Sequence, residues 1–125
     1  MTEPLKVINA KDLEAGPPTP GMTRKQVEIT DDAVMMEVRT EGGVISGWHH
    51  HGEHTTYGFV ISGSVKVEFG AGGRESLEGG AGDVFMVPAH TVHREGNPGE
   101  EEHLLLAIRI GNGPTVINVD GPDEG

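Results

Sequence analysis

The chain has 125 residues, no cysteine and a formal net charge of −11, from 9 basic and 20 acidic residues. A chain of this length corresponds to one domain, and the missing cysteines exclude disulfides, cysteine-ligated zinc and thiol nucleophiles. A phosphate backbone would be repelled by this charge, so we expect no nucleic-acid partner. The sequence shows neither a signal-peptide pattern nor an apolar run of about 20 residues, so we expect a cytoplasmic protein without a membrane segment.

In chain order, residues 1–26 are predicted to form an N-terminal arm, because their prolines exclude a long helix. Residues 27–119 hold short apolar segments separated by glycine-rich turns, which predicts one all-β domain, a small antiparallel β-barrel or jelly roll. The run at 103–110 is almost continuously apolar, so we expect it to be buried on both faces. Residues 120–125 are expected to be an acidic tail. The predicted strands are 27–30, 33–39, 43–51, 56–61, 64–70, 74–78, 84–88, 91–95, 103–110 and 115–119.

Four of the seven histidines fall within the stretch "WHHHGEH", residues 48–54. Side chains on a strand alternate between its faces, so His49 and His51 share one face, with Cα atoms about 6.6 Å apart, and His50 faces the other way. Two imidazoles at this spacing can reach one metal ion. One of His90 and His93 can complete the site from a neighbouring strand. We interpret His50, His90 and His103 as ordinary polar residues, with His103 at a strand edge.

The stretches "GWHHHGEHTTYGFVISG" and "GDVFMVPAHTVHREGN" resemble, in register, the two conserved motifs of the cupin family. The positions that match the motifs are His49, His51, Gly63, Gly82, Pro88, His93 and Asn97. The resemblance implies a cupin-like double-stranded β-helix, with one metal ion held by His49, His51 and His93. Two positions depart from the motifs. Thr56 stands where the family has a glutamate, and His90 stands where it has a glycine.

Without that glutamate, three neutral imidazoles leave the positive charge of a divalent ion uncompensated. We therefore expect a small, anionic organic ligand to bind there. Imidazole suits iron, manganese, nickel, copper and zinc alike, so the sequence does not choose among these metals. His54 is a candidate fourth ligand. Thr56 and Tyr57 are placed near the pocket, and His54 and His90 are the candidate catalytic acid–base residues.

Three functions remain open from the sequence. The first is a mononuclear metal-dependent oxygenase that acts on a small organic anion. The alternative is a non-catalytic, metal-containing cupin that binds or senses a small molecule, and the third is a metal-free sugar isomerase or epimerase. A serine hydrolase and a phosphate-binding loop are unsupported, because neither motif is present. We also expect a homodimer, since small barrels leave exposed strand edges and the arm is partly apolar.

Overall fold

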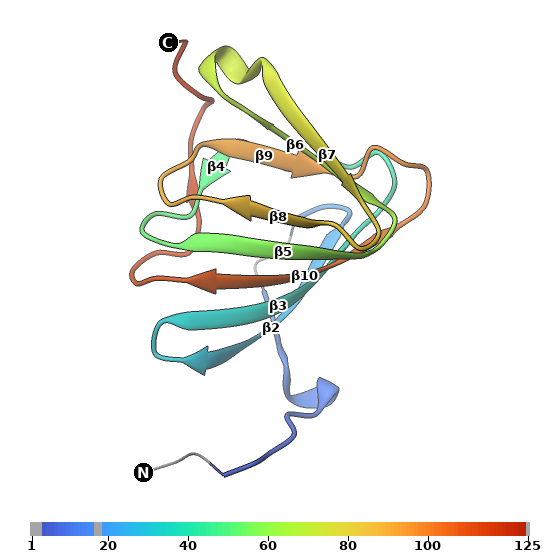
Figure 1. The fold of residues 1–125 in the computed structure, drawn as a ribbon, viewed down its shortest axis with the longest axis vertical. Coiled ribbons are helices and arrows are strands. Elements are labelled where there is room, and N and C mark those ends of the chain that lie inside the picture. The colour runs from blue at the N-terminus through green and yellow to red at the C-terminus, as the bar shows by residue number, and fades with distance from the viewer. Residues whose placement is uncertain (1–3, 17–18, 125) are drawn as a thin grey trace.

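The computed structural model describes residues 4–16 and 19–124. The segments 1–3 and 17–18 of the predicted arm and the last residue of the predicted tail lie outside the described residues. Two antiparallel β-sheets face each other to form a barrel, and the N-terminal segment extends away from it (Figure 1). The prediction of an all-β, antiparallel barrel is therefore confirmed. Within the described ranges, no helix is long and apolar enough to cross a membrane.

The described residues form one sheet of six strands and one of five. The strands of the first sheet, in spatial order, are β1 (Glu14–Ala15), β2 (Met22–Thr30), β3 (Ala33–Thr40), β10 (His103–Ile110), β5 (Thr55–Ser62) and β8 (Val84–Val87). The strands of the second sheet are β11 (Ile117–Asn118), β4 (His49–His50), β9 (His93–Gly96), β6 (Ser64–Phe69) and β7 (Glu75–Gly80). Residues 4–16 and 19–124 also include two short 3₁₀ turns, η1 (Ala10–Asp12) and η2 (Ala71–Gly73).

The core between the sheets is aliphatic and sulfur-rich, as the low aromatic content requires. Its buried members are Met22, Met36, Val38, Val60, Val65, Leu105 and Ala107. These residues alternate along their strands with residues on the outer faces, which is the period expected of half-buried sheets. The core lies on the same inner faces that carry the histidines described below, so the barrel itself positions them.

Strand β10 differs from its prediction. It is buried on one face only, because Leu105 and Ala107 are buried whereas Leu104, Leu106 and Ile108 are half-buried on the opposite, outer face. The outward-facing residues of β10 are apolar as well, because they belong to an outer sheet face that carries apolar side chains on the neighbouring strands too. The exposed apolar side chains on β5 and β8 are Tyr57, Phe59, Ile61, Val84 and Met86.

The prediction of one strand over 43–51 is wrong. Only His49 and His50 form a strand there, and Ile45 makes an isolated bridge to Gly96. Gly43, with a φ of 78°, still belongs to the preceding turn, and the chain bends at Trp48, so no continuous strand runs from 43 to 51. β2 also begins at Met22, earlier than the predicted 27, and pairs along its length with β3.

Candidate metal centre

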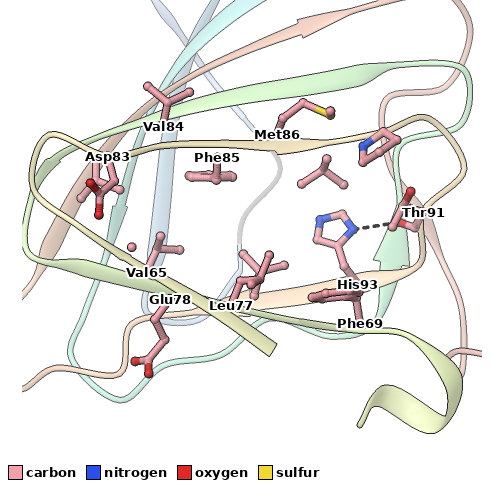
Figure 2. Close-up of a pocket in the computed structure, with 15 residues that line it drawn as sticks. Val65, Phe69, Leu77, Glu78, Asp83, Val84, Phe85, Met86, Thr91 and His93 are labelled. Carbon is pink, nitrogen blue, oxygen red and sulfur yellow. Dashed lines mark hydrogen bonds between the residues drawn. The ribbon is translucent and has the colours of Figure 1, made fainter. Parts of the chain in front are cut away.

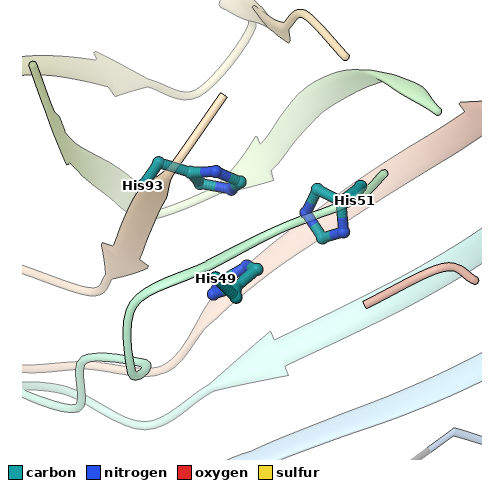
Figure 3. A group of neighbouring side chains, drawn as sticks. All are labelled: His49, His51 and His93. Atoms are coloured by element: carbon teal, nitrogen blue, oxygen red, sulfur yellow. The ribbon is translucent and has the colours of Figure 1, made fainter. Parts of the chain in front are cut away.

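Three histidines from two segments meet inside the barrel (Figure 3). His49 lies on β4 and His51 directly follows that strand. His93 is the first residue of β9 and lies directly opposite His49. One ring nitrogen of each lies within 4.8 Å of the others. The ring centroids are 4.9 Å apart for His49 and His51, 4.5 Å for His49 and His93, and 5.1 Å for His51 and His93. All three side chains are buried.

Each of these rings is oriented by a backbone carbonyl. The Nδ1 of His49 bonds to the carbonyl of Gly47 at 2.8 Å, that of His51 to Thr115 at 2.7 Å, and that of His93 to Thr91 at 2.9 Å. Because a carbonyl oxygen only accepts, Nδ1 carries the proton in all three rings. The lone pair of each neutral ring is then on Nε2, and this is how metal-binding histidines are usually held.

Two of these histidines, His51 and His49, are kept neutral by their surroundings. Burial lowers the pKa of His51 to about 2, and the positive charge of Arg109 adds to this effect. Burial also lowers the pKa of His49, against the opposing effect of its bond to Gly47. A neutral imidazole is the form that binds a metal ion, so these two residues need no deprotonation near neutral pH to act as ligands.

The residues present fit a divalent metal ion. The Nε2 of His93 is buried and has no hydrogen-bond partner among the described residues, a situation that costs free energy unless a ligand satisfies it. Three buried imidazoles with fixed tautomers and converging lone pairs make a three-ligand site of the open kind, which leaves coordination positions for other ligands.

His54 is buried but lies outside this group of three. Its Nδ1 bonds to the carbonyl of His51 at 3.1 Å. Thr56 lies on the inner face of β5, is 5% exposed, and its hydroxyl has no partner among the described residues. Tyr57 points to the outer face of the same strand, where it is 46% exposed. The structure thus buries His54 outside the group of three, puts Thr56 on the inner face of β5 and puts Tyr57 on its outer face.

His90 lies at the surface, and its backbone has a φ of 61°. This left-handed conformation explains why glycine suits the position, because a side chain there is strained. The Nε2 of His90 is 3.1 Å from a carboxylate oxygen of Glu53, and both side chains are more than half exposed. The ring of His50 lies 6.1 Å away. The three residues form a polar group on the outside of the barrel.

The prediction of His103 as a strand-edge residue is wrong. It is 1% exposed, and its Nδ1 bonds to the carbonyl of Ser64 at 2.6 Å. The turn between β5 and β6 packs on it so closely that a Cβ added at Gly63 would lie 2.8 Å from the His103 Cβ. His103 therefore helps to close the barrel at a point away from the three-histidine group.

A cavity of about 590 Å³ opens beside the site, between β8 and the strands β6 and β7 (Figure 2). His93 and Thr91 lie at one end and Asp83 at the other, and most of the wall between them is apolar. Of the three histidines, only His93 lines it. The cavity is therefore a route by which a small, partly apolar molecule can reach the metal-binding end.

Two charged residues near the histidines were not recognised in the sequence. Arg109, on β10, is 7% exposed, and its charge lowers the pKa of His51 and His49. Glu95 follows His93 by two residues on β9, so it shares the inner face, and it lies opposite Val67. A parity analysis could have found both, since Arg109 shares the inward parity of Leu105 and Ala107 within the apolar run.

Comparison with known proteins places this geometry in a family. The family model described as "Cupin domain" matches residues 35–109. A germin-like protein, subfamily T member 3, of Arabidopsis thaliana is 30% identical over 95% of this chain, which covers 52% of that protein. The chain thus spans about half the length of the curated relative it matches.

Solved structures show the same fold. KdgF from Halomonas sp. superposes with a TM-score of 0.70 at 24% identity, covering 86% of this chain and 96% of KdgF. A structure of Bacillus subtilis oxalate decarboxylase, described by its Mn(II) centres, has a TM-score of 0.74 at 20% identity. The superposition covers 88% of this chain and 31% of that enzyme. At these identities, the structural likeness establishes the fold alone.

Proposed function

The chain belongs to the cupin family, and from this premise we propose that it is a metal-binding cupin that acts on a small organic anion. The observation that carries the proposal is the buried group of His49, His51 and His93, whose ring nitrogens converge within 4.8 Å. Each ring is fixed by a carbonyl at Nδ1, which leaves the three Nε2 atoms to bind one divalent ion.

When bound, such an ion supplies Lewis-acid polarisation and open positions for substrate oxygen atoms. The three imidazoles are neutral, so they leave its positive charge to be balanced by the substrate, and this favours an anion. Imidazole donors suit iron, manganese, nickel, copper and zinc, and the Mn(II) centres named for B. subtilis oxalate decarboxylase fall within this set.

The reaction class that we propose is an oxygenase reaction on the bound organic anion. Glu95 supports an enzyme over a passive binder, because its carboxylate lies on the inner face near His49 and Arg109, whose pKa values it raises. A carboxylate in this position can accept a proton from the substrate. Most of the cavity wall is apolar, so it shields part of a bound substrate from water and strengthens the polar interactions there.

The alternative function is a cupin that captures or senses a small molecule without turnover. The cavity favours this reading, because the labelled residues beside His93 in Figure 2 are Thr91 and Phe69, and neither transfers protons at neutral pH. A metal-free isomerase needs a histidine paired with a carboxylate in the cavity. The described His90–Glu53 pair lies at the surface and does not line the cavity, so it gives no support to the isomerase.

Oxygen uptake by the metal-loaded protein tests the proposed reaction. Untagged protein loaded with iron or manganese is assayed in an oxygen electrode against small diketones, catechols and thiols. We expect uptake with at least one anionic substrate, and a clear loss in Glu95→Gln. Glu78→Gln is the matched control, because Glu78 lines the cavity away from the histidines. Full metal occupancy without uptake would exclude the oxygenase, and a melting shift with the same compounds would then support the binder.

We further propose that the protein is a homodimer that buries the outer face of the six-stranded sheet. Tyr57, Phe59 and Ile61 on β5 are each more than 40% exposed, and Val84 and Met86 on β8 are more than half exposed. Contiguous exposed apolar side chains of this kind mark interaction surfaces. Location in the cytoplasm remains a prediction from the sequence.

A further inference from the structure

Arg109 is a buried cation on the inner face of the six-stranded sheet. It is 7% exposed, and its neighbours across the sheet are Val34 on β3 and Thr56 on β5. Val87, which lines the cavity, is the next residue in the same row. Burial lowers the pKa of Arg109 to about 10, so the guanidinium remains charged at neutral pH.

In the described part of the chain, Arg109 forms no ion pair within 4.0 Å, although the charge of Glu95 raises its pKa from a longer distance. Its Nε has no hydrogen-bond partner, and no described carboxylate lies within 4.0 Å of the guanidinium. The hydroxyl of the adjacent Thr56 and the Nε2 of His93 are also buried and without partners there. Burying a polar or charged group without a hydrogen-bond partner costs free energy. Arg109 and Thr56 are such groups on neighbouring strands, so they indicate a site preorganised for a polar ligand.

The charges inside the barrel indicate the sign of the charge that this ligand carries. Arg109 contributes one positive charge, and a divalent ion at the three neutral histidines would contribute two more. Glu95 contributes one negative charge on the same inner surface. The sum is about two positive charges, so an anionic ligand is favoured. The planar guanidinium matches a carboxylate best, because its N–H groups can donate two parallel hydrogen bonds.

We propose that Arg109 binds the carboxylate of the substrate, and that the Thr56 hydroxyl donates to the same group. This inference rests on the proposed function, since it places a second oxygen of the substrate at the metal ion. Thr56 and Arg109 are paired on neighbouring strands, which are about 4.8 Å apart. The substrate class is therefore a small organic acid with a keto, hydroxyl or second carboxylate oxygen beside its carboxylate.

A pair of probes that differ only in charge tests this inference. Pyruvate and its neutral amide, pyruvamide, are titrated by calorimetry into Co(II)-loaded protein, and the visible absorption of Co(II) is recorded in parallel. We expect pyruvate to bind more tightly than pyruvamide. Arg109→Met should weaken pyruvate binding about tenfold to a hundredfold, with no change for pyruvamide and no loss of Co(II) affinity, since the removed positive charge acts against a cation at the histidines. Arg109→Lys should retain part of the preference.

Arg39→Met is the control, because Arg39 is an exposed arginine on the outer side of the same sheet, paired with Glu37 and Glu102. It should bind pyruvate as the wild type does. Without probe, Arg109→Met should melt at or above the wild-type temperature, since it removes an unpaired buried charge. A structural arginine would give the opposite result: a much lower melting temperature for Arg109→Met, and pyruvate affinity unchanged in Arg109→Lys.

The outcomes separate the inference from the proposed function. If Co(II) binds but pyruvate and pyruvamide bind alike, or Arg109→Met binds pyruvate normally, the role of Arg109 is refuted and the metal site stands. If the wild type takes up no metal, the proposed function fails. The same titration on metal-free protein then decides the inference, which is overturned unless pyruvate binding depends on Arg109.

Discussion

His93 lies directly opposite His49 across the β4–β9 pair, and their ring centroids are 4.5 Å apart. Residues 44 positions apart in the sequence are thus neighbours on one inner surface. The pairing of two very short strands, one of only two residues, sets this contact. The metal-binding geometry therefore depends on the local strand register more than on the length of the strands.

Removal of one histidine should abolish tight metal binding. His49→Ala and His93→Ala are expected to lose much more than the roughly tenfold to hundredfold affinity that follows loss of a supporting hydrogen bond. Metal content after dialysis, measured by elemental analysis, should fall from about one ion per chain to a small fraction. The control is His50→Ala, because His50 is a half-buried neighbour outside the group of three. Equal losses in His50→Ala and His49→Ala would contradict the assignment.

The metal-free protein should lose stability as the pH falls below about 6.5. The unfolded chain protonates His51 near its ordinary pKa of 6.5, whereas the folded chain holds this pKa at about 2. The unfolded state therefore binds more protons throughout this window, and stability falls with pH. For His51 alone, the loss by pH 5 is up to about 2 kcal/mol, and His49 acts in the same direction.

Urea unfolding at pH 8 and pH 5, with a chelator present, measures this loss. His51→Gln removes the titrating group while keeping a polar side chain, so the difference in stability between the two pH values should shrink. If His51→Gln and the wild type show the same difference, burial of the neutral ring is not the cause of the acid sensitivity.

His90→Gly should stabilise the fold by about 0.5–1 kcal/mol, because glycine adopts the left-handed conformation of residue 90 without strain. The exposed ion pair with Glu53 offsets little of this gain. Metal content should be unchanged, since His90 is outside the metal-binding group. Chemical denaturation gives the stability. A loss of oxygen uptake in this variant with full metal occupancy would instead support His90 as an acid–base residue.

The outer face of the six-stranded sheet should hold a homodimer together. Phe59→Glu places a charge in the middle of this apolar surface and should give a 13.2 kDa particle in light scattering, against twice that mass for the wild type. Leu5→Glu is the control for the alternative interface, because Leu5 lies in the arm and is 97% exposed. Dissociation by Leu5→Glu but not by Phe59→Glu would assign the interface to the arm.

Strand alternation explains how much of the site could be predicted. The face shared by His49 and His51 follows from the two-residue period, even though the strand ends at His50. His51 keeps its orientation because its Nδ1 bonds to the carbonyl of Thr115. The spacing of the second motif identifies His93, but the pairing that brings it opposite His49 is a long-range contact, which a single sequence does not show.

The burial of Arg109 and His103 could not be predicted, because it depends on contacts between strands that are distant in the sequence. Arg109 sits in an apolar run, where one cation is readily interpreted as a strand end facing solvent. Its burial follows from the pairing of β10 with both β3 and β5. His103 was misplaced for a similar reason, because the turn at Gly63 that covers it comes from 40 residues earlier in the chain. Local patterns identify the strands, whereas the order of the strands decides which polar residues are enclosed.

An anomalous difference map from a crystal of the Co(II)-loaded protein tests the central claim most directly. We expect one strong peak inside the barrel, with the Nε2 atoms of His49, His51 and His93 at about 2.0–2.2 Å from it. A peak at the surface beside His90 and Glu53, or at His54 without His93, would contradict the three-histidine centre.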